Sequence, residues 1–203
     1  MKKQSFSIYL FMLICLFLVF ASSCEEDDSD NNKTGTFTDP RDSNIYKTVT
    51  IDTQVWLAEN LKYLPSVVHP ETGSRITPYY YVYNYEGTNV VDAKATANYS
   101  TYGVLYNWEA AKAACPAGWH LPSKDEWTEL TIYSGGTNAT VFPVFPGGIR
   151  REDGLFYGLE YSGSWWSSTE GSTESAWRQG VNFSEDGSFY DKEFGVSVRC
   201  VKD

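Results

Sequence analysis

The four cysteines of this 203-residue chain constrain its fold more than any other feature. Lys2 and Lys3 precede the apolar run FSIYLFMLICLFLVF, and the small residues ASS follow it, a pattern that predicts an export signal over residues 1–23. Cys15 lies inside this signal and leaves with it. Cysteines in an exported chain meet an oxidising environment, where pairs form disulfides. Each remaining cysteine therefore needs a partner or a chemical modification.

Cys24 stands at the predicted cleavage point, in the sequence ASSC. This sequence resembles the lipobox of bacterial lipoproteins, in which the cysteine thiol carries a diacylglycerol and the freed amine carries a further acyl chain. Two or more acyl chains anchor a protein stably to a bilayer. We expect a lipidated Cys24 to hold the mature protein on a membrane by this anchor alone. A spanning helix is the weaker alternative, because small and acidic residues follow a rather short apolar run.

The segment after the anchor, EEDDSDNNKTG, has no apolar residue to bury and predicts a flexible tether over residues 24–35. Its acidic residues resemble signals that send lipoproteins of Bacteroidetes-like bacteria to the outer face of the outer membrane. We therefore expect an outer-membrane, lipid-anchored protein that faces the cell exterior. The rest of the chain, residues 36–203, has the length of a single domain.

Net charge argues against nucleic acid as a partner. The whole chain carries a formal charge of −10, and removal of residues 1–23 takes away two lysines and no acidic residue, which changes the charge to −12. Phosphate backbones repel such a chain, and no basic stripe compensates for the repulsion.

Cys115 and Cys200 are the cysteines left in the mature domain, and an even pair in an exported chain predicts a disulfide. The bridge would close a loop of about 85 residues, for which chain entropy gives roughly 4–5 kcal/mol. Cys115 stands five residues before His120 in ACPAGWHLPSKDEW, but we expect it to be scaffold and not a free nucleophile.

Alternation and turn residues predict short, mostly antiparallel strands. NIYKTVTI places Ile45, Lys47 and Val49 on one side, DT forms a turn, and QVWLAENL completes a hairpin. In VSVRCV the two valines and the cysteine that alternate are expected on the core face. From Tyr63 to Tyr102 we expect mostly loop, with a possible strand in PYYYVYNY, and SEDG predicts a hairpin turn. Further strands are predicted in VFPVFPGGIR, GLFYGLEYSGSWWSSTE, AWRQGVNF and GSFYDKEF.

Two helices are predicted. Helical spacing and strong helix formers predict the first over Trp108–Ala114, with a proline soon after it. Ser123 and Glu126 form a capping box for the second, which Gly135 and the next glycine end. His120 is expected to pack the GWHLP loop between them. The fold class is therefore α+β and loop-rich.

Five motifs, in order, resemble the Fibrobacter-type major paralogous domain, a family of exported bacterial proteins. They are TVTIDTQVWLAENLKY, YGVLYNWEAAKAACPAGWHLPSKDEWTEL, FPGGIR, SWWSSTE and GVSVRCVKD. The resemblance runs from about Thr36 to Asp203. It implies a C-type lectin-like domain, in which a cysteine on the first helix pairs with one on the last strand, and Cys115 and Cys200 occupy those places.

The residue pattern gives little support to catalysis, and we expect no enzymatic activity. WHLPSKDEW resembles a segment of the sulfatase-modifying-factor relatives, which generate formylglycine and need a cysteine pair as copper ligands. Cys115 and Cys200 stand instead at structural disulfide positions. His69 and His120 are isolated and do not form a zinc ligand cluster.

A binding role fits better, because C-type lectin-like folds present long loops on a disulfide-tied frame. The calcium triplets of sugar-binding members are missing, so no cofactor is expected, although acids such as Asp153 or Asp186 leave a Ca²⁺ site open. Aromatic side chains could stack on a glycan or protein ligand, or fill the core. The candidates are Tyr79, Tyr80, Tyr81, Trp165, Trp166 and Trp177.

A structural component of a surface assembly is the alternative function. An exposed apolar patch or an unpaired edge strand would favour it. Exposed aromatics on a concave surface would favour ligand binding instead.

Overall fold

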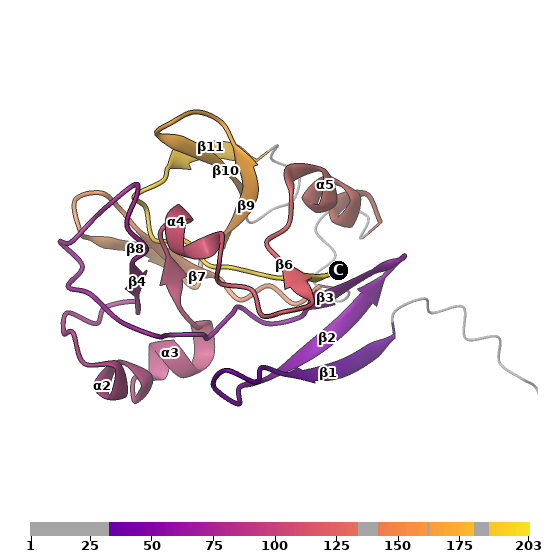
Figure 1. The fold of residues 1–203 in the computed structure, drawn as a ribbon, viewed down its shortest axis with the longest axis horizontal. Coiled ribbons are helices and arrows are strands. Elements are labelled where there is room, and N and C mark those ends of the chain that lie inside the picture. The colour runs from indigo at the N-terminus through magenta and orange to yellow at the C-terminus, as the bar shows by residue number, and fades with distance from the viewer. Residues whose placement is uncertain (1–32, 134–141, 162, 181–186) are drawn as a thin grey trace, which may run out of the picture. The chain divides into compact units, whose positions relative to one another are not determined.

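The predicted hairpin near the start of the domain is the centre of a five-stranded antiparallel sheet. A computed structural model describes residues 33–133, 142–161, 163–180 and 187–203, which belong to one compact unit, Asn31–Asp203. The sheet has the order β1-β2-β3-β12-β6 (Figure 1). Its strands are β1 (Thr34–Thr38), β2 (Ile45–Ile51), β3 (Gln54–Leu57), β6 (Trp119–His120) and β12 (Val201–Lys202). Since β1 begins at Thr34, residues 34–35 of the expected tether belong to the sheet.

Smaller antiparallel sheets complete the described part of the chain. A three-stranded sheet has the order β11-β10-β9, and β4 pairs with β5 and β7 with β8. These strands are β4 (Tyr80–Tyr81), β5 (Leu105–Tyr106), β7 (Gly147–Arg150), β8 (Phe156–Leu159), β9 (Ser164–Glu170), β10 (Ser175–Gly180) and β11 (Ser188–Asp191). The α+β class with short antiparallel strands is confirmed. The SEDG turn lies largely outside the described residues.

The described residues form four helices, so the expectation of two is wrong. They are α2 (Val90–Lys94), α3 (Ala97–Tyr102), α4 (Trp108–Ala111) and α5 (Lys124–Tyr133). The segment expected to be loop holds α2 and α3, whose first turns are capped by the side chains of Asn89 and Thr96. Both helices are too short to show a hydrophobic period, which is why the pattern misses them.

The two expected helices are present with shifted or partly described ends. α4 begins at Trp108 as predicted but ends at Ala111 and continues as turns. The capping box of α5 is confirmed: Ser123 N–H donates to Glu126 Oε2 (2.7 Å) and Glu126 N–H to Ser123 Oγ (3.2 Å). The glycine pair after α5 lies outside the described residues.

Two hydrophobic clusters pack on opposite faces of the five-stranded sheet. The first contains Tyr46 and Leu57, and the second contains Val49 and Trp56, each from β2 and β3. Opposite faces are expected because Tyr46 and Val49 differ in parity along β2, as do Leu57 and Trp56 along β3. Thus β2 and β3 separate the two halves of the core.

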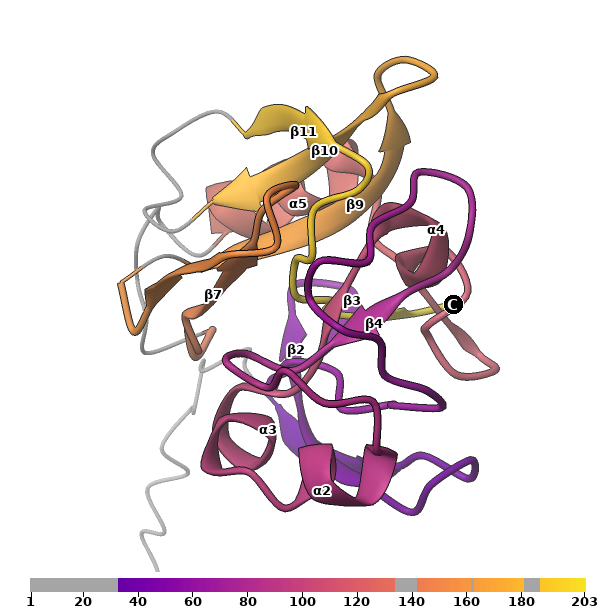
Figure 2. The same cartoon turned by 90° about the vertical axis from the view of Figure 1, so that its left-hand side faces the viewer.

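The segment Gly195–Val201 is buried throughout and contributes to both clusters. Cys200 packs in the first cluster and Val201 in the second. Figure 2 shows this segment, in yellow, between the β11-β10-β9 sheet and the β2–β3 hairpin. The prediction that one face of VSVRCV meets the core is therefore incomplete, because Ser197 and Arg199 on the other face are buried as well.

The predicted disulfide is confirmed. Cys115 and Cys200 are bonded, with their Cα atoms 5.9 Å apart. Cys115 follows α4 and is partly exposed, whereas Cys200 is fully buried next to β12. The bridge ties the segment after α4 to the buried C-terminal segment.

His120 connects three parts of the chain. Its Nε2 lies 2.8 Å from Glu126 Oε1 in α5, and its Nδ1 lies 2.6 Å from Asp203 Oδ1. Burial alone would lower the pKa of His120, but the two carboxylates outweigh it and raise the pKa above its ordinary value. Burial would raise the pKa of Glu126, but hydrogen bonds from Ser123 and His120 lower it.

The disulfide prediction concerns global stability. Replacing both Cys115 and Cys200 by alanine should lower the free energy of unfolding by roughly 2–5 kcal/mol, since the bridge spans 85 residues. Urea unfolding measures the loss, and either single variant should lose about as much as the double variant because one bond is shared. Mass spectrometry of the unreduced protein should show the paired peptides. An alkylatable Cys115 in the exported protein contradicts the bridge.

The His120 prediction concerns pH. Because the pKa of His120 is raised in the folded state, its contacts with the two carboxylates contribute fully to stability below the ordinary value of 6.5. This contribution is lost as pH rises through the folded pKa. Because the pKa of Glu126 is lowered in the folded state, its contribution to stability is complete above the ordinary value of 4.5 and is lost as pH falls through the folded pKa. Chemical unfolding should therefore show His120→Gln to be destabilised most between these values, by roughly 0.5–1 kcal/mol, and less at higher pH.

His69→Gln is the matched control, since His69 is similarly exposed but, among the described residues, lies near one carboxylate and not two. It should change the free energy of unfolding much less than His120→Gln does. A His120→Gln penalty that does not change with pH would contradict the charged network.

Candidate functional site

Four of the six candidate aromatics are core residues. Tyr81, Trp165, Trp166 and Trp177 are at most 3% exposed. The indole N–H of Trp165 donates to Asn60 Oδ1 (2.9 Å), so this ring is also fixed by a buried hydrogen bond. These four side chains cannot stack on an external ligand in this structure, which corrects their proposed exposure.

Their burial has a topological reason. β9 lies beside the buried C-terminal segment, where Trp166 N–H donates to Ser197 O (3.1 Å). Trp165 then enters the second hydrophobic cluster and Trp166 the first, because neighbouring residues of a strand point to opposite faces. Both faces of this part of β9 are therefore inside the core.

Tyr79 and Tyr80 are partly exposed. The backbone of Tyr79 is held by the buried side chain of Asn107, whose Oδ1 accepts from Tyr79 N–H at 2.8 Å. Tyr80 packs edge-on against Tyr106, with ring centroids 5.7 Å apart. These two remain the candidates that a ligand could reach.

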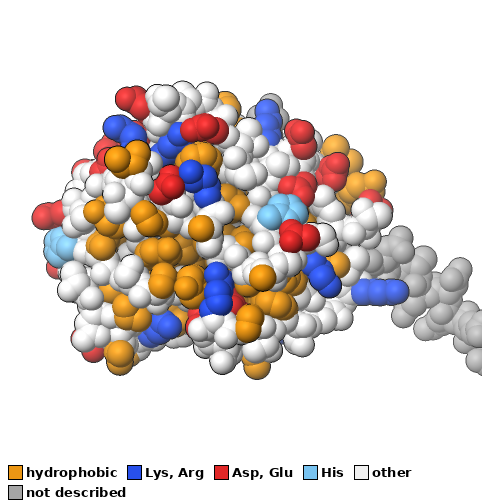
Figure 3. All heavy atoms as spheres, viewed as in Figure 1, with side chains coloured by type: hydrophobic (Ala, Val, Ile, Leu, Met, Phe, Trp, Pro, Cys, Tyr) orange, Lys and Arg blue, Asp and Glu red, His pale blue; other side chains and the backbone are white. Residues whose placement is uncertain are grey.

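A cation lies on a neighbouring aromatic ring. The guanidinium of Arg41 stands 3.8 Å from the ring centroid of Tyr63, and Asp39 holds it through an ion pair of 2.6 Å. In the space-filling view, hydrophobic side chains gather on one face of the molecule among charged groups (Figure 3). Because Arg41 is already paired with Asp39, the contact that Arg41 and Tyr63 offer is mainly aromatic and aliphatic.

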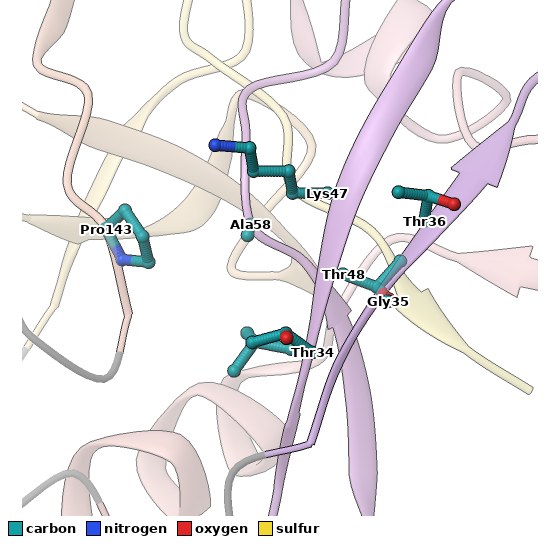
Figure 4. A pocket seen from close by; sticks show the side chains of 8 residues that line it. Thr34, Gly35, Thr36, Lys47, Thr48, Ala58 and Pro143 are labelled. Carbon is teal, nitrogen blue, oxygen red and sulfur yellow. The ribbon is translucent and has the colours of Figure 1, made fainter.

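A groove of about 520 Å³ lies on one face of the β1–β2 ladder, a volume within the usual range of small-ligand sites. It is lined by Thr34, Gly35, Thr36, Lys47, Thr48, Val49, Ala58 and Pro143. Figure 4 shows Lys47 extending above Ala58 across the space between β2 and the segment of Pro143. Residues from three separated parts of the chain therefore form the site.

Strand pairing explains which side chains face the groove. Thr34 is opposite Val49 and Thr36 is opposite Lys47, and residues directly opposite in an antiparallel pair share a face. Val49 is buried in the second cluster, whereas Lys47, Thr34 and Thr36 are exposed. The groove thus begins where the second cluster stops covering this face of the sheet.

Buried polar groups hold the Pro143 side of the groove. Asn60 Nδ2 donates to Phe145 O (2.9 Å), and Arg199 donates from its Nη2 to Pro143 O (2.7 Å) and from its Nε to Asn60 Oδ1 (3.1 Å). Burial lowers the pKa of Arg199 to about 9, with Glu59 opposing the shift. This network gives the groove a fixed wall.

The groove combines polar side chains with an apolar floor. Thr34 and Thr36 provide hydroxyl groups, Lys47 provides an ammonium group, and Val49 and Ala58 provide the apolar surface. Within the described ranges, no carboxylate forms an ion pair with Lys47. Its three N–H donors can therefore meet a hydroxyl or carboxylate of a ligand.

The other sequence candidates do not come together. His120 belongs to the stabilising network of β6 and α5, and His69 Nδ1 accepts from the backbone of Glu71 (3.3 Å). Asp153 Oδ1 accepts from Leu155 N–H within its own turn (3.0 Å), while Asp186 lies outside the described residues. Across the part of the chain that the structure describes, no three His, Cys, Asp or Glu side chains are grouped to hold a metal ion.

The anchor residue Cys24 and the export signal also lie outside the described residues. Of the helices that are described, none has the length and apolar character needed to cross a bilayer.

Sequence reasoning missed the residues of the groove. The alternation of β2 correctly places Lys47 and Val49 on one side of the strand. The alternation does not show that the second hydrophobic cluster covers this side of β2 at Val49 but not at Lys47. That boundary depends on where Phe142 and Trp127 pack on Trp56. An exposed lysine alternating with a buried valine is the one local signal for such a boundary.

Comparisons with known proteins bear on family and not on activity. Neither the comparison with curated proteins nor that with solved structures gives a match. A family match covers the end of β2, the strand β3, the helices α2 to α5 and Cys115, and so supports the resemblance seen in the first two sequence motifs. The match is to the Fibrobacter succinogenes major domain, over residues 49–139 of the chain.

Proposed function

We propose that this protein is a non-enzymatic binding module, held by lipidated Cys24 on the outer face of the outer membrane. The small-residue run before Cys24 and the acidic tether after it support the anchor and the location. In this proposal the domain has a C-type lectin-like fold. The bridge between the segment after α4 and the C-terminal segment supports that fold, because the resemblance implies a bridge at those places.

The groove on the β1–β2 ladder carries the proposal. Its hydroxyl groups and the ammonium of Lys47 stand above the apolar floor of Val49 and Ala58. Sugars and peptides present both hydrogen-bonding groups and apolar faces, and a carboxylate on either would meet Lys47. We therefore propose a glycan or a protein segment with a hydroxyl or carboxylate group as the ligand.

An assembly component is the second candidate function, and the outer edge of β1 favours it. β1 is the terminal strand of the five-stranded sheet and is largely exposed. A formylglycine-generating activity is disfavoured, because Cys115 and Cys200 are bonded to each other and are not free thiolate ligands.

The lining of the groove predicts that substitution of one lysine, Lys47, weakens ligand binding. A glycan and protein array probed with residues 25–203 should reveal a ligand whose affinity falls about tenfold or more in Lys47→Ala, since a hydrogen bond to a charged group contributes roughly 1.5–3 kcal/mol. Lys124→Ala removes an exposed lysine of α5 outside the groove and should bind normally. Equal loss, or no loss, in both variants would contradict the groove as the site.

The anchor predicts a change of location. Cys24→Ala should release the protein from the membrane fraction and abolish labelling by a fatty-acid probe, because the acyl chains have no other attachment. Cell fractionation and probe labelling measure both, with Cys15→Ala as the control that keeps the anchor. Unchanged membrane association of Cys24→Ala would contradict the lipid anchor.

A further inference from the structure

We infer that two copies of this chain associate through the outer edges of their β1 strands. A strand at the edge of a sheet presents unpaired N–H and C=O groups that can pair with another chain. Native proteins usually protect such an edge with charged side chains, proline or a bulge. β1, with the sequence TGTFT, contains none of these between Thr34 and Thr38.

The pairing of β1 with β2 shows which backbone groups are free. Thr50 N–H donates to Lys33 O (2.8 Å), and Asp39 N–H donates to Asn44 O (2.9 Å). Residues 33, 35, 37 and 39 therefore direct their backbone groups toward β2, because these directions alternate along a strand. Thr34, Thr36 and Thr38 direct theirs toward the outer edge of the sheet, where no other described strand pairs with β1.

A two-fold axis at Thr36 satisfies all of these outward groups. In an antiparallel pair with this axis, Thr36 is opposite the Thr36 of the second copy and Thr34 is opposite its Thr38. Each of these residue pairs can exchange both backbone hydrogen bonds. A closed two-fold contact of this kind also gives a dimer and not an open fibre.

The side chains fit the same register. Gly35 is opposite Phe37, and an aromatic ring across from a glycine covers the backbone that the glycine leaves bare. The ring of Phe37 already has a fixed position, 5.0 Å from that of Trp119. Lys33 is opposite Asp39, which has the opposite charge but is already paired with Arg41, so this contact adds little.

The dimer would also extend the groove. Thr34, Thr36 and Thr38 share the groove face of β1, so the two-fold pair aligns six threonines across two copies. This inference rests on the assembly candidate and does not require a ligand in the groove. Lys47→Ala should therefore leave self-association unchanged even where it removes ligand binding.

Cysteine cross-linking of the full exported chain tests the register. In Thr36→Cys the two Cα atoms would be about 5.5 Å apart, within the range that a disulfide bridges. In Thr34→Cys the two equivalent atoms would be about 14 Å apart, from four residues of strand rise. Oxidation with diamide should therefore cross-link Thr36→Cys into a dimer and leave Thr34→Cys monomeric. Thr34→Cys co-expressed with Thr38→Cys should give the mixed dimer.

Sedimentation of residues 25–203, which include the whole compact unit, tests the hydrogen bonds. Thr36→Pro removes an outward N–H and no bond to β2, so it should abolish the dimer with little loss of monomer stability. Cross-linking of Thr34→Cys as efficient as that of Thr36→Cys would overturn the register. The inference would be overturned if the wild-type protein sediments as a monomer over a 100-fold range of protein concentration and Thr36→Cys gives no cross-linked dimer on membranes.

Discussion

The burial of Gly195–Val201 is the constraint on which the rest of the structure depends. Backbone carbonyls of this segment accept from residues in several other parts of the chain, namely Leu57, Leu61, Tyr106, Arg150 and Trp166. Its side chains enter both hydrophobic clusters, and Cys200 adds a covalent bond to Cys115. One short segment thus joins the five-stranded sheet, β5, β9 and the region after α4.

This arrangement determines which surfaces are left for binding. Because the C-terminal segment needs cover on both sides, Trp165 and Trp166 of β9 are used as core residues. The surfaces that the described residues offer as binding candidates include the partly exposed Tyr79 and Tyr80, the groove beside Lys47 and the edge of β1. The last two share Thr34 and Thr36, so ligand binding and self-association use neighbouring atoms of the same strand.

Local signals in the sequence predict local structure well. The β2–β3 hairpin follows from alternation and a two-residue turn, where Asp52 takes a positive φ of 52°, and the start of α5 follows from the reciprocal bonds of Ser123 and Glu126. The disulfide follows from an even pair of cysteines in an exported chain. Each of these depends on few residues or on simple pairing, which explains why the prediction succeeds.

Burial of single side chains could not be predicted in the same way. Whether Trp177 fills the core or faces solvent depends on the packing of β10 against its neighbour β9 and against α5, which is distant in sequence. The groove likewise depends on the Pro143 segment, which Asn60 and Arg199 hold from other parts of the chain. Long-range contacts, and not residue types, decide these positions.

Native-state hydrogen exchange tests the central role of the C-terminal segment most directly. The amides of Leu57, Leu61, Tyr106 and Trp166 should be among the slowest to exchange and should share one free energy of opening, because all four donate to Gly195–Val201. That shared value should equal the global free energy of unfolding. Fast exchange at these amides, or widely different opening energies, would show that the segment is not the part that joins the fold.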